Sequence, residues 1–184
     1  MKPFSRLETT RLVLRELADA DVPRIVALAS DQAVARNTLN MPHPYHPDYA
    51  YNWLRLTYEA YQLGEGITFA VELKAIGEFV GGIGLKIEPR FDRGEVGYWL
   101  GVPYWGQGLM TEALAAVLRF GFEELKLNKI MANHTGQNPG SGAVMLKNGM
   151  VKEGYFVEHI KRDGEYHDLA QYRLTRREYA QLQG

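Results

Sequence analysis

The stretch GYWLGVPYWGQGLMTEAL, residues 97–114, is the most informative part of this 184-residue sequence. Its pattern predicts a strand that ends near Leu100, a glycine-rich turn, and a helix that begins between Leu109 and Thr111. Backbone N–H groups in such a turn converge on one point, and the helix dipole adds positive potential there, so the turn suits a phosphate. Gly106 and Gly108 permit positive φ values and the close approach of a ligand. A helix start that needs glycines for its own geometry is an equally weighted alternative.

Two familiar phosphate-binding patterns fit this turn poorly. Gly101 and Gly106 have the spacing of a P-loop, but Gln107 and Gly108 stand where a P-loop needs Lys and Ser or Thr to hold the γ-phosphate and Mg²⁺. The dinucleotide fingerprint lacks its last glycine, and the next predicted strand ends at Asn133 instead of at an acid that binds a ribose. Nucleotide hydrolysis and a Rossmann fold are therefore disfavoured.

Outward from the turn, the hydrophobic spacing alternates between that of strands and that of helices. Strands are expected at 7–17, 68–73, 78–87, 95–101, 130–133, 155–160 and 165–174. Helices are expected from Asp19 or Asp21 to Ser30, around 53–61 with Gly64 at the end, at 111–127, and at 141–148 with Gly149 at the end. The third helix carries one apolar stripe of Leu114, Val117, Leu118, Gly121 and Leu125.

This order of elements predicts the fold class α/β (α+β). The sheet is expected to be mixed and mostly antiparallel, with helices on both faces. Asp163-Gly164, between the last two strands, is the strongest short hairpin signal in the chain. Repeats and low-complexity linkers are absent, so residues 1–184 are expected to form one domain.

Composition excludes several classes of protein. With 21 Lys and Arg against 22 Asp and Glu, the net charge is −1, so no overall basic field attracts nucleic acid or an anionic membrane. The absence of cysteine excludes disulfides, thiolate-bound zinc and a covalent acyl-cysteine intermediate. The first 17 residues lack the apolar region of a signal peptide, and no stretch has the length of a membrane span. We therefore expect a cytoplasmic protein without direct nucleic-acid or membrane binding.

The sequence resembles the GNAT superfamily of acetyl-CoA-dependent N-acetyltransferases, and within it the branch that acetylates the amino termini of ribosomal proteins. The resemblance covers nearly the whole chain, through LETTRLVLREL (7–17), EVGYWLGVPYWGQGLMTEAL (95–114), NPGSGAVMLKNGMVKEG (138–154) and DGEYHDLAQYRL (163–174). The family's pyrophosphate loop has Gln or Arg, two variable residues, Gly, one more residue, and Gly or Ala. In this chain the loop falls on 105–110, where Trp105 and the bulky Met110 depart from that pattern.

The resemblance implies acetyl-CoA as co-substrate and no metal. Coenzyme A would lie where two central strands splay apart, one ending near Gly101 and the other near Asn133. Its pyrophosphate would meet the main chain of the loop and helix start, namely Trp105, Gly106, Gln107, Gly108, Leu109, Met110 and Thr111. Main-chain groups of Trp99, Leu100 and Val102 would pair with the pantetheine, with the Leu100 N–H on the thioester carbonyl. Asn138 would hydrogen-bond the pantetheine, or serve only as a turn residue before proline.

Two side chains are candidates for the proton transfers. By resemblance, Glu95 would accept the amine proton through a water, with a solvated carboxylate or a structural ion pair as the equal alternative. Ser141 would donate to the coenzyme A sulfur, with helix capping as its alternative. Because the chain has no cysteine, direct attack by the amine in a ternary complex is the simplest mechanism. An amino-terminal amine, with a pKa of about 7.7–8.0, needs less help from a base than lysine at about 10.4.

The acceptor is expected to be a primary amine, with a protein amino terminus as first choice. A small amine such as a polyamine, an amino acid or an aminoglycoside is the alternative. A non-catalytic acyl-CoA-binding module and a nucleotide-binding protein are the two rivals outside this chemistry. Family members often pair, so a homodimer is a possible assembly.

Histidines and aromatic residues give weaker signals. His43 and His46 lie three residues apart without a third ligand nearby, so a loop is favoured over a metal site. His159 and Asp168 would face each other across the predicted hairpin, more often as a structural pair than as a base and its partner. Most of the aromatic residues between 45 and 61 are expected to pack, with some bordering the acceptor.

Overall fold

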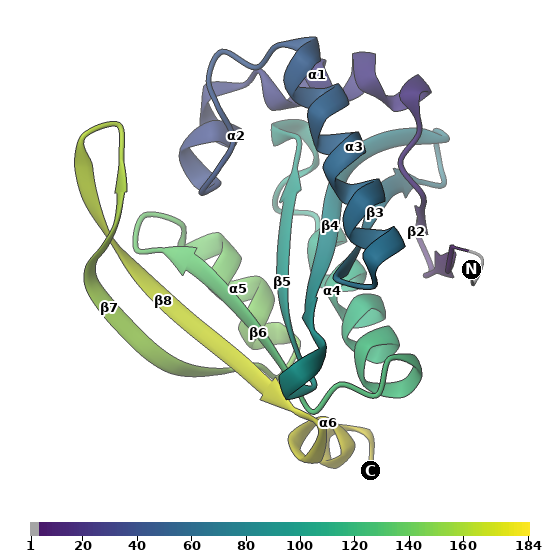
Figure 1. Cartoon of the computed structure of the whole chain (residues 1–184), viewed down its shortest axis with the longest axis vertical. Coiled ribbons are helices and arrows are strands. Elements are labelled where there is room, and N and C mark those ends of the chain that lie inside the picture. The colour runs from purple at the N-terminus through teal and green to yellow at the C-terminus, as the bar shows by residue number, and fades with distance from the viewer. Residues whose placement is uncertain (1–3) are drawn as a thin grey trace.

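A computed structural model describes residues 4–184 and contains one eight-stranded sheet, in the order β1-β2-β3-β4-β5-β6-β8-β7 (Figure 1). All neighbouring strands are antiparallel except β5 and β6, which are parallel, so the predicted mixed and mostly antiparallel sheet is confirmed. The strands are β1 Leu7–Glu8, β2 Leu12–Arg15, β3 Gly66–Leu73, β4 Glu78–Glu88, β5 Arg93–Leu100, β6 Lys129–Thr135, β7 Val151–Arg162 and β8 Glu165–Thr175. The single strand predicted over 7–17 is two short strands instead, because the chain turns at 9–11 and pairs Leu7 with Leu14.

Helices cover both faces of the sheet, as predicted (Figure 1). One apolar core lies between the sheet and α4 and α5, and a second lies under α1 and α3. The sequence pattern missed two short helices, α2 and α6. The bounds are α1 Val22–Ala29, α2 Gln32–Asn37, α3 Pro47–Leu63, α4 Leu109–Arg119, α5 Pro139–Lys147 and α6 Arg176–Gln183. Within residues 4–184, no helix combines the length and the apolar composition that crossing a bilayer requires.

Local turn signals in the sequence were reliable. Gly64 follows α3 with φ of 72°, and Gly149 follows the end of α5 with φ of 75°, so both helix ends are confirmed. Asp163 and Gly164 have φ of 53° and 87° and join β7 to β8 as the predicted two-residue turn.

The predicted end of the third helix is wrong in one respect. After α4, residues Phe120–Glu124 form a π-helical turn, which takes in an extra residue and rotates the following positions. Leu125 therefore leaves the apolar stripe and is 36% exposed, whereas Leu127 is 3% exposed and belongs to the core.

Asp21, one of the two residues from which the first helix is expected to begin, precedes α1 directly, but its side chain makes no capping hydrogen bond to that helix. Its carboxylate instead accepts two hydrogen bonds from Arg15, each at 2.8 Å, and one from the Ala18 N–H at 2.9 Å. Arg15 also donates to the Glu72 carboxylate on β3 at 2.6 Å. Through Arg15, the buried Asp21 carboxylate therefore links the start of α1 to the sheet.

The predicted pair of His159 and Asp168 is wrong. The register of β7 and β8 jumps from Phe156↔Leu169 to Ile160↔His167, so three residues of β7 bulge opposite Asp168. The Asp168 carboxylate accepts from Tyr155 Oη at 2.6 Å and from the Glu158 N–H at 2.8 Å, and the His159 ring packs on Phe156.

The central strands splay as the resemblance implied. β5 and β6 pair from Arg93↔Lys129 to Val96↔Ala132 and then separate, although β5 continues to Leu100 and β6 to Thr135. Beyond Val96 and Ala132 the edges of both strands face an opening in the sheet.

Candidate active site

Two clefts meet at this opening. The first, about 520 Å³, lies beside α4 and α5 and is called the α4 cleft; the second, about 550 Å³, lies beside α3 and the segment before it and is called the α3 cleft. The residues that line both are Asn37, Thr38, Tyr98, Trp99, Asn138 and Ser141. The splayed sheet therefore connects one cleft with the other.

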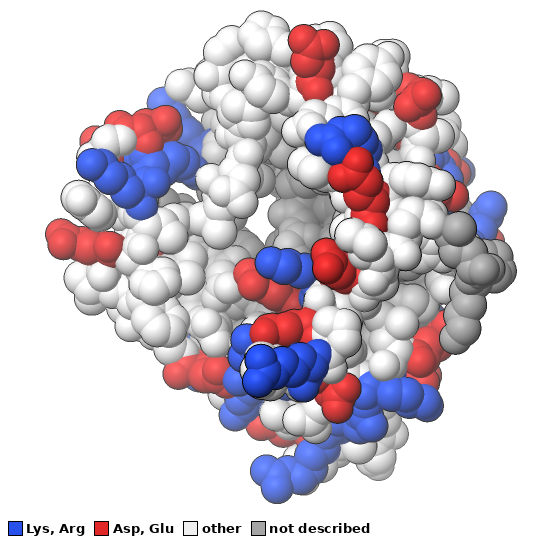
Figure 2. All heavy atoms as spheres, in the orientation of Figure 1, with Lys and Arg blue, Asp and Glu red and all other residues white. Residues whose placement is uncertain are grey.

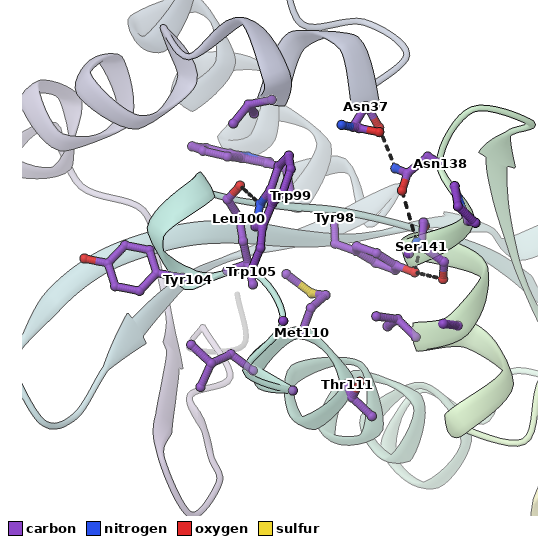
Figure 3. A pocket seen from close by; sticks show the side chains of 18 of the residues that line it. Asn37, Tyr98, Trp99, Leu100, Tyr104, Trp105, Met110, Thr111, Asn138 and Ser141 are labelled. Atoms are coloured by element: carbon purple, nitrogen blue, oxygen red, sulfur yellow. Dashed lines mark hydrogen bonds between the residues drawn. The ribbon is translucent and has the colours of Figure 1, made fainter.

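The glycine-rich turn forms one end of the α4 cleft (Figure 3). Gly106 and Gly108 have φ of 72° and 74°, so the predicted positive φ values are confirmed. The first hydrogen bond of the helix runs from Glu112 N to Gly108 O at 3.1 Å, so the N–H groups of 109–111 precede it and have no partner within the helix. The helix start thus presents main-chain donors and the positive end of its dipole to the cleft.

Three hydrogen bonds hold the turn in place. Arg11 donates from Nη1 to Gln107 O at 2.9 Å and from Nε to the Glu112 carboxylate at 2.7 Å. The Trp105 indole N–H donates to Leu100 O at 2.7 Å and fixes the turn to the end of β5. Burial raises the pKa of Glu112, but hydrogen bonds from Thr9 and Arg11 outweigh it and lower that pKa overall. The Trp105 side chain, a departure from the family pattern, is therefore part of the scaffold of the turn.

Met110, the other departure, points from α4 toward β5 (Figure 3). Its side chain is only 5% exposed and belongs to the main apolar core. Most of the Met110 side chain is thus packed in the core, and the small part that stays exposed forms part of the wall of the α4 cleft.

The free edge of β5 offers main-chain groups to the opening. Gly101 N donates to Val80 O at 3.0 Å, so Gly101 faces β4, and alternation along the antiparallel pair turns Trp99 the same way. Tyr98 and Leu100 therefore direct their main-chain groups toward the gap. The Leu100 carbonyl already accepts the Trp105 indole N–H, so the Leu100 N–H is the group that Leu100 offers to a ligand. This alternation places Tyr98, and not the predicted Trp99, beside Leu100 on the free edge. The Trp99 ring instead packs between Trp53 and Phe79.

A chain of hydrogen bonds crosses the junction of the clefts (Figure 3). Ser141 Oγ donates to Tyr98 Oη at 3.0 Å, and Tyr98 Oη donates to Ser141 O at 3.0 Å. Asn138 caps α5 by accepting from Ser141 N at 3.1 Å, and its Nδ2 donates to Asn37 O at 2.9 Å. The capping residue is thus Asn138 and not Ser141, which leaves the Ser141 hydroxyl on the cleft wall. The geometry also supports the structural alternative for Asn138, because both ends of its amide are bonded within the protein.

Glu95 lies in the α3 cleft, on the same side of the sheet as α3. Its Oε1 accepts from Asn133 Nδ2 at 2.9 Å, and its side chain is exposed. A carboxylate on one side of the opening and a hydroxyl pair on the other is an arrangement that can deprotonate an amine and protonate a leaving group.

Comparison with known proteins shows the family to which the chain belongs. A family model described as an acetyltransferase (GNAT) domain matches residues 11–151, well over half of the chain. The chain belongs to the GNAT acetyltransferase family. It is 31% identical over 183 residues to the ribosomal protein uS5-alanine N-acetyltransferase of Escherichia coli (strain K12), with 94% of this chain and 92% of that protein covered. GNAT members are N-acetyltransferases that use acetyl-CoA, and this chain is such an enzyme.

Solved structures agree with the GNAT fold. A GNAT-family acetyltransferase from Bacillus anthracis superposes with a TM-score of 0.84 at 26% identity, covering 94% of this chain and 99% of that one. RimL, a ribosomal L7/L12 α-N-protein acetyltransferase solved with coenzyme A, superposes with a TM-score of 0.85 at 22% identity, covering 93% and 98%. The second likeness concerns the fold alone.

Most of the site residues predicted for this GNAT enzyme meet at the two clefts. Those that line the α4 cleft are Trp99, Leu100, Trp105, Gly106, Gly108, Leu109, Met110, Thr111, Asn138 and Ser141. Glu95 lines the α3 cleft, and two predicted residues line neither cleft: Val102 lies in the 3-10 turn Val102–Tyr104, and Gln107 turns its side chain back to Pro103 O at 2.8 Å. Sequence reasoning missed Tyr98 and Asn37 as parts of this site. Tyr98 stands within the stretch quoted first, but only the tertiary contact with Ser141 distinguishes it from other aromatic residues.

Proposed function

We propose that this GNAT enzyme transfers the acetyl group of acetyl-CoA to the amino terminus of a protein. The observation that carries the proposal is the meeting of the two clefts at Tyr98 and Ser141. The α4 cleft ends in a turn suited to a pyrophosphate, and the α3 cleft contains a carboxylate suited to an amine. The name of the 31% identical relative, which specifies an alanine of ribosomal protein uS5 as the group acted on, supports an amino-terminal acceptor.

In this proposal, coenzyme A occupies the α4 cleft. The pyrophosphate accepts hydrogen bonds from the main chain at Gly106, Gly108 and the start of α4. The pantetheine pairs with the free edge of β5, which extends that edge as an added strand would. RimL, a protein of the same fold, was solved in complex with coenzyme A, which supports coenzyme A as a ligand of this chain.

The chemistry follows from the groups at the junction. Glu95 takes a proton from the ammonium through a water, and the neutral amine attacks the thioester carbonyl. The Leu100 N–H stabilises the oxyanion that forms, since alternation along β5 directs it into the gap at the end of the strand. The carbon–sulfur bond then breaks, and the surplus proton of the new amide nitrogen is passed to the thiolate through the Ser141 hydroxyl. Ser141 gives its own proton to sulfur and receives the one from nitrogen, so it ends the step unchanged, and coenzyme A leaves as the thiol.

Ligand-dependent thermal unfolding, followed by an amine screen, tests the proposal. Acetyl-CoA and coenzyme A are expected to raise the unfolding temperature, since a ligand at a hundredfold excess over Kd stabilises the folded state by about 2.7 kcal/mol. ATP and NAD are the controls and are expected to have no effect. Mass spectrometry of peptides incubated with acetyl-CoA is expected to show one acetyl group on the α-amine. Binding without acetylation of any amine would contradict an enzymatic role and favour an acyl-CoA-binding module.

A further inference from the structure

Three consecutive residues at the end of β6 carry polar atoms that lack partners. Among residues 4–184, the buried side-chain nitrogen and oxygen atoms without a hydrogen bond are Asn133 Oδ1, His134 Nε2 and Thr135 Oγ1. All three residues line the α3 cleft. Buried polar groups are nearly always hydrogen-bonded, because leaving one unpaired is costly. Their concentration where β5 has left β6 indicates that a ligand supplies the missing partners.

Two of the three atoms lie on the acceptor side of the sheet. Ile130 and Ala132 belong to the core under α4, so alternation turns Asn133 and Thr135 to the opposite face, with Glu95. The Asn133 side chain donates a hydrogen bond from Nδ2 to Glu95, and its Oδ1 remains as an unpaired acceptor beside that carboxylate. Thr135 is 4% exposed, and its hydroxyl is the next polar group along the strand.

His134 has a different environment. Its Nδ1 lies 2.7 Å from Thr135 O, an arrangement in which Nδ1 carries the proton and Nε2 is an acceptor. A Cβ placed on Gly142 would lie 2.7 Å from Nε2, so that atom is packed against α5. Only Asn133 and Thr135 therefore face the acceptor.

The rest of the α3 cleft is nearly uncharged. Among residues 4–184, Glu95 is the one carboxylate that lines this cleft, and no Lys or Arg lines it. Lys86 stands opposite Glu95 on β4 and further reduces the attraction for a second positive charge. The remaining wall consists of amides, hydroxyls and aromatic rings, among them Asn52, Tyr49 and Trp53. The rim of the hollow toward α2 is likewise largely free of charged residues (Figure 2).

We propose that the acceptor is an amino-terminal segment whose first two residues are uncharged, which rests on the function proposed above. The α-ammonium lies between Glu95 and Asn133 Oδ1, and an N–H or hydroxyl of the first residues donates to Thr135 Oγ1. One carboxylate matches one ammonium. A polyamine or an aminoglycoside brings further cations for which the cleft has no anions, and an acidic terminus places its carboxylate near Glu95.

A charge-varied panel of acceptors tests this assignment with the intact enzyme. Peptides that differ only at residues 1 and 2, with Ala, Ser, Asp or Lys there, are compared with spermidine at fixed acetyl-CoA. The neutral termini are expected to give kcat/KM values at least about tenfold above the charged ones, the effect of one unpaired buried charge or hydrogen-bonding group. Equal values across the panel, or a preference for spermidine, overturn the assignment while leaving acetyl transfer intact. Absence of all turnover, with coenzyme A still bound, refutes the proposed function itself.

Thr135→Val distinguishes an acceptor contact from a structural role. Because the hydroxyl has no partner among residues 4–184, the variant is expected to have a thermal midpoint no lower than that of the wild type and an unchanged KM for acetyl-CoA. Its kcat/KM for the Ala peptide is expected to fall about fivefold to tenfold, the effect of one lost hydrogen bond. Thr57→Val, on α3 and outside both clefts, is the control: it removes a hydroxyl that donates to Leu54 O at 2.9 Å, and it is expected to leave kcat/KM for the Ala peptide and the KM for acetyl-CoA unchanged. A lower thermal midpoint without loss of peptide turnover would overturn the role given to Thr135.

Discussion

Ser141 and Tyr98, 43 positions apart in the sequence, exchange two hydrogen bonds of 3.0 Å. The hydroxyl of Ser141 donates to the phenol, and the phenol donates to the Ser141 carbonyl. Burial raises the pKa of Tyr98 to about 12, although the hydrogen bond from Ser141 lowers it in part. The phenol is therefore protonated at neutral pH and holds the Ser141 hydroxyl in one orientation where the two clefts meet.

Tyr98→Phe is expected to lower kcat about tenfold while leaving the KM for acetyl-CoA within about twofold of the wild type, because one hydrogen bond that orients Ser141 is lost. Steady-state kinetics at saturating peptide measures both constants. Tyr58→Phe, on the 56% exposed Tyr58 of α3, is the matched control and is expected to leave both unchanged. An unchanged kcat in Tyr98→Phe would show that the phenol does not act through Ser141.

The same tyrosine is expected to make the fold sensitive to alkali. In the unfolded chain the phenol loses its proton near pH 10, but in the folded protein it does so only near pH 12. The protonated phenol therefore contributes its full share to the free energy of unfolding below pH 10. That free energy falls by about 2–3 kcal/mol as the pH rises from 10 toward 12. Denaturant unfolding at several pH values should show a shallower decline in Tyr98→Phe than in the wild type. Parallel declines in the two proteins would contradict the assignment.

Gly108→Ala is expected to destabilise the protein by about 1–2 kcal/mol and to weaken acetyl-CoA binding, because φ at this position is 74°. The added Cβ would meet only Arg11 Nη2 at 3.6 Å, so backbone strain and not a clash is the cause. Gly77→Ala is the control, since Gly77 has φ of 64°, lies in open space and lines neither cleft. It should lose similar stability by denaturant unfolding but keep the wild-type Kd for acetyl-CoA. If both variants bound acetyl-CoA with the same Kd, the turn at Gly108 would have no role in coenzyme binding.

The parts of this site that sequence predicts are those set by neighbouring residues. The turn at Gly106 and Gly108 is visible because positive φ favours glycine, and the two-residue turn at Asp163-Gly164 is visible for the same reason. The splayed sheet was predictable only through the family resemblance, since no spacing within β5 or β6 indicates where their pairing stops.

The features that sequence missed depend on contacts between distant residues. Tyr98 acquires its role from Ser141, and the unpaired atoms of Asn133 and Thr135 follow from the departure of β5. The bulge opposite Asp168 shifts the register that a two-residue turn would otherwise set. The π-helical turn at Phe120–Glu124 changes the helix period, and no glycine or proline at its end marks that change in the sequence. Periodicity alone indicates none of these.

Arg11→Ala is expected to raise the KM for acetyl-CoA about fivefold to tenfold with a smaller change in kcat, because Arg11 joins Gln107 O to the Glu112 carboxylate and so fixes the turn. Arg6→Ala removes an arginine that is 61% exposed and, among the described residues 4–184, forms an ion pair with Glu8 alone, and it is expected to have no effect. Initial rates over a range of acetyl-CoA concentrations measure the difference. A loss confined to kcat would place Arg11 outside coenzyme binding.

Arg162→Ala is expected to raise the KM for the peptide while leaving that for acetyl-CoA unchanged. The Arg162 guanidinium, at the end of β7, donates to Ala35 O, Arg36 O and Thr38 O at 3.3, 3.1 and 2.8 Å, and so fastens the hairpin to the end of α2 beside the α3 cleft (Figure 1). Without it, the outer wall of the acceptor cleft loosens. Lys161→Ala, the adjacent cation, is the control; equal effects of the two variants would indicate a charge effect instead of this contact.

Glu95→Gln is expected to lower kcat/KM for an amino-terminal acceptor most strongly at low pH. Below its pKa of about 7.7–8.0 the amine is protonated and needs a base, whereas at pH 9 it is already neutral. We therefore expect a loss of about tenfold at pH 6.5 that shrinks to within about twofold at pH 9. For a lysine side chain, with a pKa of about 10.4, the loss should persist at pH 9. Glu59→Gln, on α3 and outside the cleft lining, controls for the change of charge. A constant loss across the pH range would mean that Glu95 positions the amine without taking its proton.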